Sequence, residues 1–600
     1  MFCLGVFHAG LNSWFQADDF AWLGMSTQIY DTRSFFHVIF EPSRQGTLRP
    51  LSEHLFFVSF WRMFGFDAFP YRAWVMLNQC MNLVLLCWMV RRLSGSNAAG
   101  FLAAVFWTAN ASLATAMGWT SGYNQILCVT CLLGALACWI RFAETGRLLF
   151  YALQLLIFIA GFGVLELMVV YPALAAALAF TLSNRRRLLL WTAPLFALSV
   201  LYFLVHRAVT PRQTAGAYAM HFGPEMFATF GRYWQWTFVP LHGAFQWPVV
   251  LLASAALFAF LLRESAHRRW LVFFFVSWYA VTLAPLLPLQ NHVSYYYLAV
   301  PSLGIAAASA LAIANTWRGN VAAKALGMLI ACVLMGGQIP AALSMTAWQR
   351  DQSLAVRNVV LGVDRIHELH PGKTILLTDV SANLYETAIA SMPFRLIPGA
   401  QVYLAPDVPG VIGPLSAHLP PVSNFVLPAE PARHAFESGQ IVVYSAALPV
   451  LRNVTKTYAM LLAGLPREVP RRVDPGAPLM AYLLGPEWYP IEGVYRWMPK
   501  RATLRIGGPR QASDKLVLSG YAAPESVRTG GLSFSVTVDG QPAGIAMLRP
   551  KEDSYVREFT LPRAAMGKPS VEIAITVNRT FQRDPQGRAL GLVFGTFEIR

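Results

Sequence analysis

Long apolar runs follow one another from Met1 to about Trp348, and they constrain the fold more than any other feature of the chain. Most of them hold roughly 16–25 residues, the length at which an α-helix crosses a lipid bilayer. A helix satisfies its backbone amides internally, as a segment in lipid must do. The pattern predicts eleven spans, at residues 1–15, 72–90, 98–115, 121–140, 148–164, 166–183, 188–206, 247–263, 270–288, 294–315 and 321–346.

The first run is short for a full crossing. It has neither a basic amino-terminal region nor a small-residue cleavage site, so it does not resemble a cleaved signal peptide. We expect it to be part of a first helix whose start lies upstream.

Basic residues in the short connections predict the orientation, because Lys and Arg mark the cytoplasmic side. Five basic connections fall on one side: Arg91–Arg92, Arg141 with Arg147, Arg185–Arg187, Arg263 with Arg268–Arg269, and Arg318 with Lys324. The other, outer side then receives residues 16–71, 116–120, a short turn near Glu166, 207–246, 289–293 and everything after about 347. The net charge of +16 is explained by this orientation and by anionic lipid, and no nucleic-acid motif is present. We expect a multi-pass protein of the inner (plasma) membrane.

Beyond residue 347 the chain has no long apolar run and shows ordinary polar spacing. A helix is predicted at 352–370 and a buried strand at Lys373–Thr378. From about residue 497 short alternating strands follow, and Leu532–Val538 runs into Asp539-Gly540, a hairpin turn signal. The expected organisation is a polytopic α-helical membrane domain (1–347), an extracytoplasmic mixed α/β region (348–490) and an extracytoplasmic β-sandwich-like domain (491–600).

The seven cysteines all lie in apolar runs, so no disulfide framework is expected. Cys128 and Cys131 have metal or redox spacing, but neither His nor acidic residues accompany them, and buried packing is the simpler interpretation. Walker, Gly-x-Ser-x-Gly and His-Glu-x-x-His motifs are absent, which disfavours ATP-driven transport and soluble-type hydrolysis.

Two adjacent carboxylates, Asp18 and Asp19, stand where the first helix would reach the outer surface. They repel each other and lose hydration there, so one is expected to meet a cation, a metal ion or an acceptor hydroxyl. An aspartate in that place can act as a general base. The alternative is a solvated pair in which Asp caps a helix. If a divalent metal ion is bound, these two residues are its candidate ligands.

Three basic side chains on the same predicted face are candidates for binding a phosphate. Arg49 can clamp a phosphate with its planar guanidinium, or its side chain can simply extend to the membrane surface. His54 can share that phosphate or cap an interfacial helix. His292 lies in an aromatic segment, Asn291–Tyr297, for which an interfacial aromatic belt is the alternative.

Glu166 lies between two apolar runs, and an ionisable group at the edge of a span indicates function more often than it does elsewhere. The alternative is a polar turn between two helices. Side chains suited to hydrogen bonds with sugar hydroxyls share the outer face, although an aromatic belt would look similar: Trp119, Tyr123, Gln125, Tyr295 and Tyr296.

Taken in order, the outer-face motifs resemble one family. They are Ala17-Asp18-Asp19-Phe20, Leu48-Arg49-Pro50-Leu51-Ser52-Glu53, Phe64–Tyr71, Trp119-Thr120-Ser121-Gly122, Leu165-Glu166 and Asn291–Ser302. The order is similar to that of bacterial multi-pass glycosyltransferases of the GT-C fold, related to the protein O-mannosyltransferase and lipid A aminoarabinose transferase group. The resemblance covers about 16–310. It departs at Tyr295–Tyr297, where related sequences often carry an arginine.

The resemblance implies transfer of a sugar from a polyprenyl-phosphate carrier to a glycan, lipid or protein acceptor. It implies that Asp18 and Asp19 match the acidic pair of the first outer loop, Arg49 the Arg-Pro-Leu position and Glu166 a later acidic residue. Some members use a divalent metal ion and others do not. Two other classes stay open: a transporter or flippase for a lipid-linked saccharide, and a membrane-anchored carbohydrate-binding protein without catalysis.

Overall fold

The computed structural model describes most of the 600 residues. The exceptions are residues 42–46, 183, 211–215, 240–245, 318–319, 414–418, 448, 494, 523–530, 550–551, 553 and 583–586. By its internal contacts the chain divides into two units. The first comprises Met1–Gly362, Ala382–Pro398 and Pro414–Pro420, and the second comprises Val363–Ser381, Gly399–Gly413 and Pro421–Arg600.

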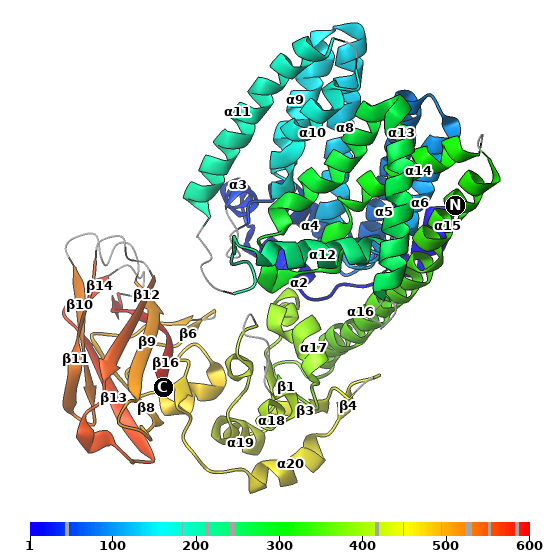
Figure 1. Ribbon diagram of the computed structural model, residues 1–600. Coiled ribbons are helices and arrows are strands. Elements are labelled where there is room, and N and C mark those ends of the chain that lie inside the picture. Colours follow the sequence, from blue (N-terminus) through cyan, green and yellow to red (C-terminus); the bar gives the residue numbers. More distant parts are fainter. Residues whose placement is uncertain are drawn as a thin grey trace. The chain divides into compact units, whose positions relative to one another are not determined.

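Helices form the first unit (Figure 1). Long or apolar ones are α1 (Phe2–Leu11), α5 (Phe69–Ser94), α6 (Asn97–Ala109), α8 (Tyr123–Thr145), α9 (Leu148–Phe162), α10 (Tyr171–Ala179), α11 (Arg185–Val209), α13 (Gln246–Leu283), α14 (Ser302–Thr316), α15 (Val321–Gly336) and α16 (Gln338–Leu369). A helix therefore occurs at each predicted span. Within the described residues, five helical segments are long and apolar enough to cross a membrane and six more are shorter. The count of eleven spans stays a prediction.

Two helices differ from the prediction. Helical backbone of α13 continues through the basic connection expected between the spans 247–263 and 270–288. That connection holds neither Gly nor Pro, the residues that most disfavour a helix. Likewise, α16 begins after Gly337 inside the last predicted span and continues through the helix predicted at 352–370.

Short helices occupy the predicted outer segments 16–71 and 207–246: α2 (Asp19–Leu23), α3 (Thr32–Phe40), α4 (Phe56–Phe64) and α12 (Glu225–Phe238). Another short helix, α7 (Leu113–Gly118), begins near the end of the predicted span 98–115. Figure 1 shows α12 running across the direction of α13. Phe36, Phe40 and Phe227 are exposed on them, as aromatic residues at a headgroup layer would be. Asp31 and Ser34 form a capping box that starts α3.

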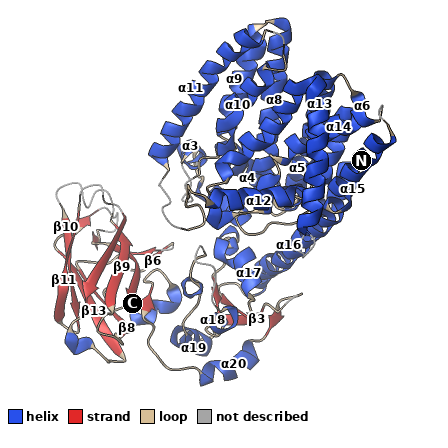
Figure 2. Ribbon diagram, viewed as in Figure 1, coloured by secondary structure: helices blue, strands red, loops and turns tan. Residues whose placement is uncertain are grey.

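Every described strand belongs to the second unit (Figure 2). Strands β1 (Thr374–Thr378), β2 (Val402–Leu404) and β3 (Ile441–Ser445) are parallel, and β4 (Arg452–Asn453) completes the order β2-β1-β3-β4. All five residues of β1 are buried, which confirms the strand predicted at 373–378. The helices of this unit include α18 (Val408–Ile412), α19 (Ala429–Glu437) and α20 (Thr455–Gly464), whereas α17 (Ala382–Thr387), which follows β1 in the chain, belongs to the first unit.

Two antiparallel sheets follow, with the orders β11-β10-β13-β8 and β12-β9-β16-β5. Their strands are β5 (Arg472–Val473), β8 (Arg501–Gly507), β9 (Lys515–Tyr521), β10 (Leu532–Val538), β11 (Gln541–Leu548), β12 (Ser554–Thr560), β13 (Ser570–Val577) and β16 (Val593–Ile599); short pairs are β6 (Ile491–Glu492) with β7 (Tyr495–Arg496) and β14 (Phe581–Gln582) with β15 (Ala589–Leu590).

The predicted hairpin is confirmed, because β10 pairs with β11 across Asp539 and Gly540. Both turn residues have positive φ, +48° and +79°, as a two-residue type I′ turn requires. Phe534 of one sheet contacts Tyr555 and Phe594 of the other, at centroid distances of 5.7 and 5.8 Å. The β-sandwich class itself stays a prediction.

Candidate active site

The loop before α2 has an unusual backbone. Ala17 has φ +47°, a region that residues with a Cβ seldom occupy and that persists only where neighbours enforce it. Its amide donates a hydrogen bond to the carbonyl oxygen of Thr387 at 2.5 Å. Asp18 follows directly, is partly exposed and occupies the N-cap position of α2. Strain of this kind is typical of functional loops, and it places the first carboxylate of the pair at a fixed position.

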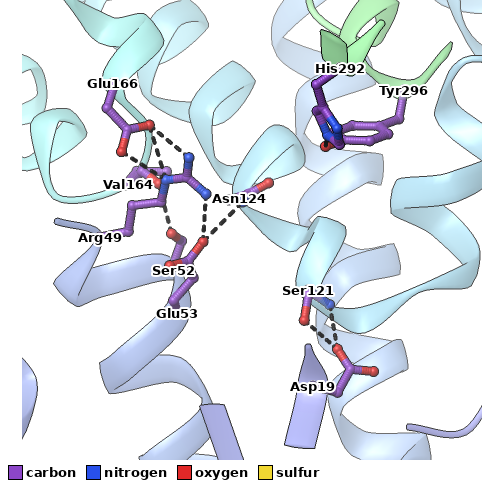
Figure 3. Close-up of polar contacts among 10 residues, drawn as sticks. All are labelled: Asp19, Arg49, Ser52, Glu53, Ser121, Asn124, Val164, Glu166, His292 and Tyr296. Atoms are coloured by element: carbon purple, nitrogen blue, oxygen red, sulfur yellow. Dashed lines mark hydrogen bonds and ion pairs between the residues drawn. The ribbon is translucent and has the colours of Figure 1, made fainter. Parts of the chain in front are cut away.

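Asp19, in contrast, is completely buried and hydrogen-bonded. Its Oδ1 accepts bonds from the Ser121 amide at 2.7 Å and the Ser121 hydroxyl at 2.5 Å (Figure 3), and its Oδ2 accepts from the Gln16 amide at 3.0 Å. Burial raises the pKa of Asp19 to about 7, while the bonds from Ser121 and Gln16 and the charge of Arg72 act to lower it. Asp19 thus fastens the loop to η3 (Thr120–Gly122), whereas Asp18 keeps an exposed surface.

Arg72 is a buried residue of this network that sequence reasoning missed. It begins the second turn of α5 and is 2% exposed. Its guanidinium donates to the carbonyl oxygens of Gly10, at 2.9 Å, and Met117, and to the Thr120 hydroxyl at 3.5 Å. An arginine just inside the outer end of a predicted span was a signal that the sequence did contain.

Arg49 pairs with two carboxylates (Figure 3). Its Nε lies 3.0 Å from both oxygens of Glu166, its Nη2 lies 2.9 Å from Oε2 of Glu166, and its Nη1 lies 2.7 Å from Oε1 of Glu53. Asn124 also donates to Glu53 at 3.2 Å. Burial lowers the pKa of Arg49, but the two carboxylates outweigh it and hold that pKa well above the usual value. Arg49 is therefore a permanent cation whose charge is shared by two anions.

The backbone around Arg49 is fixed by η2 (Pro50–Leu55), a π-helical turn of a kind that is frequent at functional sites. The Leu51 amide donates to the Gly163 carbonyl at 2.9 Å, and the Ser52 hydroxyl donates to the Val164 carbonyl at 2.7 Å (Figure 3). These bonds join the Arg-Pro-Leu motif to the segment that carries Glu166. The two predicted site residues are thus brought together from distant parts of the chain. The phosphate role predicted for Arg49 stays a prediction, and a phosphate would share its guanidinium with the two carboxylates.

His54 is 1% exposed. One ring nitrogen, Nδ1, lies 2.7 Å from the Ile39 carbonyl, and the ring lies 6.0 Å from that of Trp22. Burial lowers the pKa of His54, and Nδ1 is assigned as the donor because its partner, a carbonyl oxygen, can only accept. The phosphate role predicted for His54 remains a prediction, with no exposed surface to serve it.

His292 ends η6 (Gln290–His292), and Tyr296 belongs to η7 (Tyr295–Leu298). Their side chains lie side by side in a part of the site separate from the Arg49 ion pairs (Figure 3). The His292 Nε2 is 3.4 Å from the Tyr296 hydroxyl, and the His292 ring lies 4.8 Å from that of Tyr218. Tyr296 is largely buried, and the charges of Arg49 and Asp18 act on its hydroxyl in opposite directions. The same two charges act on Tyr218, a further residue that sequence reasoning missed. Asp18, Arg49 and the His292 cluster therefore share one electrostatic environment.

The residues predicted to bind sugar hydroxyls make contacts within the protein. The Trp119 indole donates to the Gln16 carbonyl at 3.2 Å. The Tyr123 hydroxyl accepts from the Trp74 indole at 2.8 Å, and Gln125 is 5% exposed. These contacts position the outer loops, and the sugar-binding role of the three residues stays a prediction.

Tyr295 donates to the Gln338 side chain at 3.0 Å. Gln338 begins α16, is buried, and also contacts the Ala111 amide and the Trp236 and Thr237 carbonyls at 2.9–3.2 Å. One amide thus joins α16 to three outer segments, a role that no sequence signal indicated. Tyr295 supports this junction, and its sugar-binding role stays a prediction.

Metal ligands are sparse around the acidic pair. In the part of the chain that the structure describes, no three His, Cys, Asp or Glu side chains converge as ligands. Both oxygens of Asp19 already accept hydrogen bonds, so a divalent ion at the pair would share them with the Ser121 and Gln16 donors. Binding of a metal ion by Asp18 and Asp19 stays a prediction.

The raised pKa of Asp19 predicts that the stability of the protein depends on pH. Its folded-state pKa of about 7 lies above the ordinary 3.8, so its contribution to stability is complete below pH 3.8 and is lost as pH rises through about 7. Between about pH 4 and pH 7 we expect the Tm of the wild type to fall more steeply than that of Asp19→Asn, which cannot ionise. Thermal unfolding in detergent micelles measures both slopes, and equal slopes would contradict a buried group titrating there.

No protein-family model matches the chain, and no curated protein matches it. Seventeen chains of solved structures do. ArnT from Cupriavidus metallidurans bound to undecaprenyl phosphate is 14% identical, with a TM-score of 0.37, over 77% of this chain and 94% of its own. The oligosaccharyltransferase AglB from Archaeoglobus fulgidus, in complex with an inhibitory peptide and a dolichol-phosphate, is 10% identical, with a TM-score of 0.38, over 95% of this chain and 92% of its own.

Both neighbours are glycosyltransferases of the GT-C fold, the class that the outer-face motifs resemble.

Proposed function

We propose that the protein is an integral membrane glycosyltransferase that moves a hexosyl or pentosyl unit from a polyprenyl-phosphate carrier to an extracytoplasmic acceptor. The observation that carries the proposal is the Asp18 loop. A partly exposed carboxylate follows a strained residue with φ +47°, and its charge and that of Arg49 act on the same two tyrosines. The order of the outer-face motifs supports the same activity.

In the proposed reaction, the acceptor hydroxyl attacks the anomeric carbon of the donor sugar. The bond from that carbon to the phosphate oxygen breaks, and the polyprenyl phosphate leaves with the electron pair. Asp18 takes the acceptor proton as general base. Arg49 and His292 are the candidate groups that stabilise the charge developing on the phosphate, an electrostatic effect that is often the largest single contribution to catalysis.

The location suits such a reaction. The lipid tail of the donor must stay in the bilayer while its sugar meets a water-borne acceptor. A site on loops and short helices between apolar helices satisfies both requirements. The exposed phenylalanines of α3 and α12 belong to the same outer segments. We assign this face to the outer side of the plasma membrane because the basic connections predict that orientation. The strand-rich residues 491–600 are proposed to be an extracytoplasmic β-sandwich.

The test uses the full-length protein in proteoliposomes with short-chain polyprenyl-phosphate sugars labelled in the sugar. Expected products are the labelled acceptor, or free sugar where water is the acceptor, and one equivalent of polyprenyl phosphate. Movement of intact donor between leaflets without release of polyprenyl phosphate would indicate a flippase instead. If the protein binds the donor but neither releases polyprenyl phosphate nor moves the donor between leaflets, it is a binding protein.

A further inference from the structure

One segment of the carboxyl-terminal half lies within the first unit. Residues 382–398 form the connection between β1 and β2, two strands of the second unit, yet their contacts place them with Met1–Gly362. The segment contains α17, η8 (Ile389–Ser391) and η9 (Pro393–Leu396). It is fixed there by a bond from Asn383 to Gln352 and by the Tyr385 hydroxyl, which donates to the Pro420 carbonyl at 2.6 Å.

This segment holds the acidic pair from both sides. Before the pair, the Thr387 carbonyl accepts the hydrogen bond from the strained Ala17 at 2.5 Å. After the pair, the Arg395 Nη2 donates to the carbonyls of Phe20 and Ala21 at 2.7 and 3.0 Å. These carbonyls belong to α2, whose C-terminal end carries partial negative charge. The positive charge of Arg395 therefore stabilises the carbonyl end of α2.

Gly24 makes room for the Arg395 guanidinium. A Cβ at this position would lie 2.0 Å from the Nε and 2.2 Å from the Cζ of Arg395. The backbone itself does not require glycine, because the φ of Gly24 is −63°. An alanine there would therefore fit the backbone and displace only the flexible end of Arg395. The two residues act on α2 through one contact and can be altered independently.

We propose that residues 382–398 are a clamp on the catalytic loop and that Arg395 is a positioning residue for Asp18. The inference rests on the proposed function. The clamp lies in the chain between β1 and β2, so a segment from the carboxyl-terminal half of the sequence contributes to the catalytic geometry. A displacement of about 1 Å in a reacting group can cost on the order of 100-fold in rate.

The test compares Arg395→Ala, Arg395→Lys and Gly24→Ala in the full-length protein. We expect kcat for sugar transfer to fall about 10–100-fold in Arg395→Ala and Gly24→Ala, with the donor KM changed by less than about threefold, because geometry rather than donor binding is lost. Arg395→Lys keeps a cation at the carbonyls and should recover part of the rate. Arg147→Ala, at an exposed arginine before α9, is the control and should match the wild type.

Amide hydrogen exchange gives a second readout that does not depend on activity. Peptides covering residues 14–23 should exchange faster in Arg395→Ala and in Gly24→Ala, since the contact of Arg395 with the Phe20 and Ala21 carbonyls is lost. The double variant should be no worse than either single one. Unchanged exchange, or faster exchange with an unchanged kcat, would overturn the clamp. If the wild type transfers no sugar, the proposed function fails, and the exchange experiment still decides whether the contact exists.

Discussion

Replacing Asp18 with Asn is expected to reduce sugar transfer by more than about 100-fold, because a positioned general base contributes at least that much. The substitution keeps the size of the side chain and leaves the buried bonds of Asp19 intact. Asp18 is partly exposed, so stability should change little. Initial rates with labelled donor, measured at equal amounts of folded protein, give the result. Activity equal to that of the wild type would show that Asp18 is not the general base, and it would favour the transporter or binding alternatives.

Asp19→Asn is the matched control, since it changes the neighbouring carboxylate in the same way. The side-chain NH₂ of the new asparagine would replace one oxygen of Asp19 and could not accept a hydrogen bond. It would stand opposite the Gln16 amide, which donates to Oδ2 in the wild type, or opposite the two Ser121 donors, which bond Oδ1. Leaving one buried donor unsatisfied costs about 1–3 kcal/mol, so this variant should lose stability first. Its rate per folded molecule should fall less than that of Asp18→Asn. The reverse order of effects would assign the base to Asp19.

The elements that a local pattern determines could be predicted from the sequence. A helix lies at each apolar run because burial and lipid favour one, and Asp539-Gly540 gave the hairpin because both turn residues must take positive φ. The basic connections also placed Asp18, Arg49, Glu166 and His292 on one face. The helical continuation through 264–268 was missed, because a charged connection between two apolar runs does not by itself end a helix.

The pairings inside the site could not be predicted, because they depend on tertiary packing. Arg49 and Glu166 are 117 residues apart, and Arg395 is 375 residues from the Phe20 carbonyl that it contacts. Neighbouring residues at the start of a helix point in different directions, so Asp18 and Asp19 were free to have different surroundings. Which of the two is buried depends on how α2 meets η3 at Ser121. A single sequence contains the residues of such a network but no distances between them.

Removing the charge of Arg49 is expected to destabilise the protein strongly. Arg49→Met leaves Glu166 and Glu53 without a cation, and breaking a buried ion pair from one side costs about 3–5 kcal/mol. The Glu166 side chain is 28% exposed, so the lower end of that range is expected. Equilibrium unfolding in mixed micelles measures the loss. Stability equal to that of the wild type would show that the three charged groups do not form this network.

Two further variants separate the structural role of Arg49 from a role in donor binding. Glu166→Gln removes one negative charge, so its combination with Arg49→Met should cost less than the sum of the single losses by about 0.5–3 kcal/mol. Arg49→Lys keeps the charge but cannot bond Glu166 with two parallel donors. If Arg49 also contacts the donor phosphate, Arg49→Lys should raise the donor KM at a temperature where it is fully folded. If the donor KM is unchanged while stability falls, the role of Arg49 is structural. The cluster of His292 and Tyr296 is then the candidate contact for the donor phosphate.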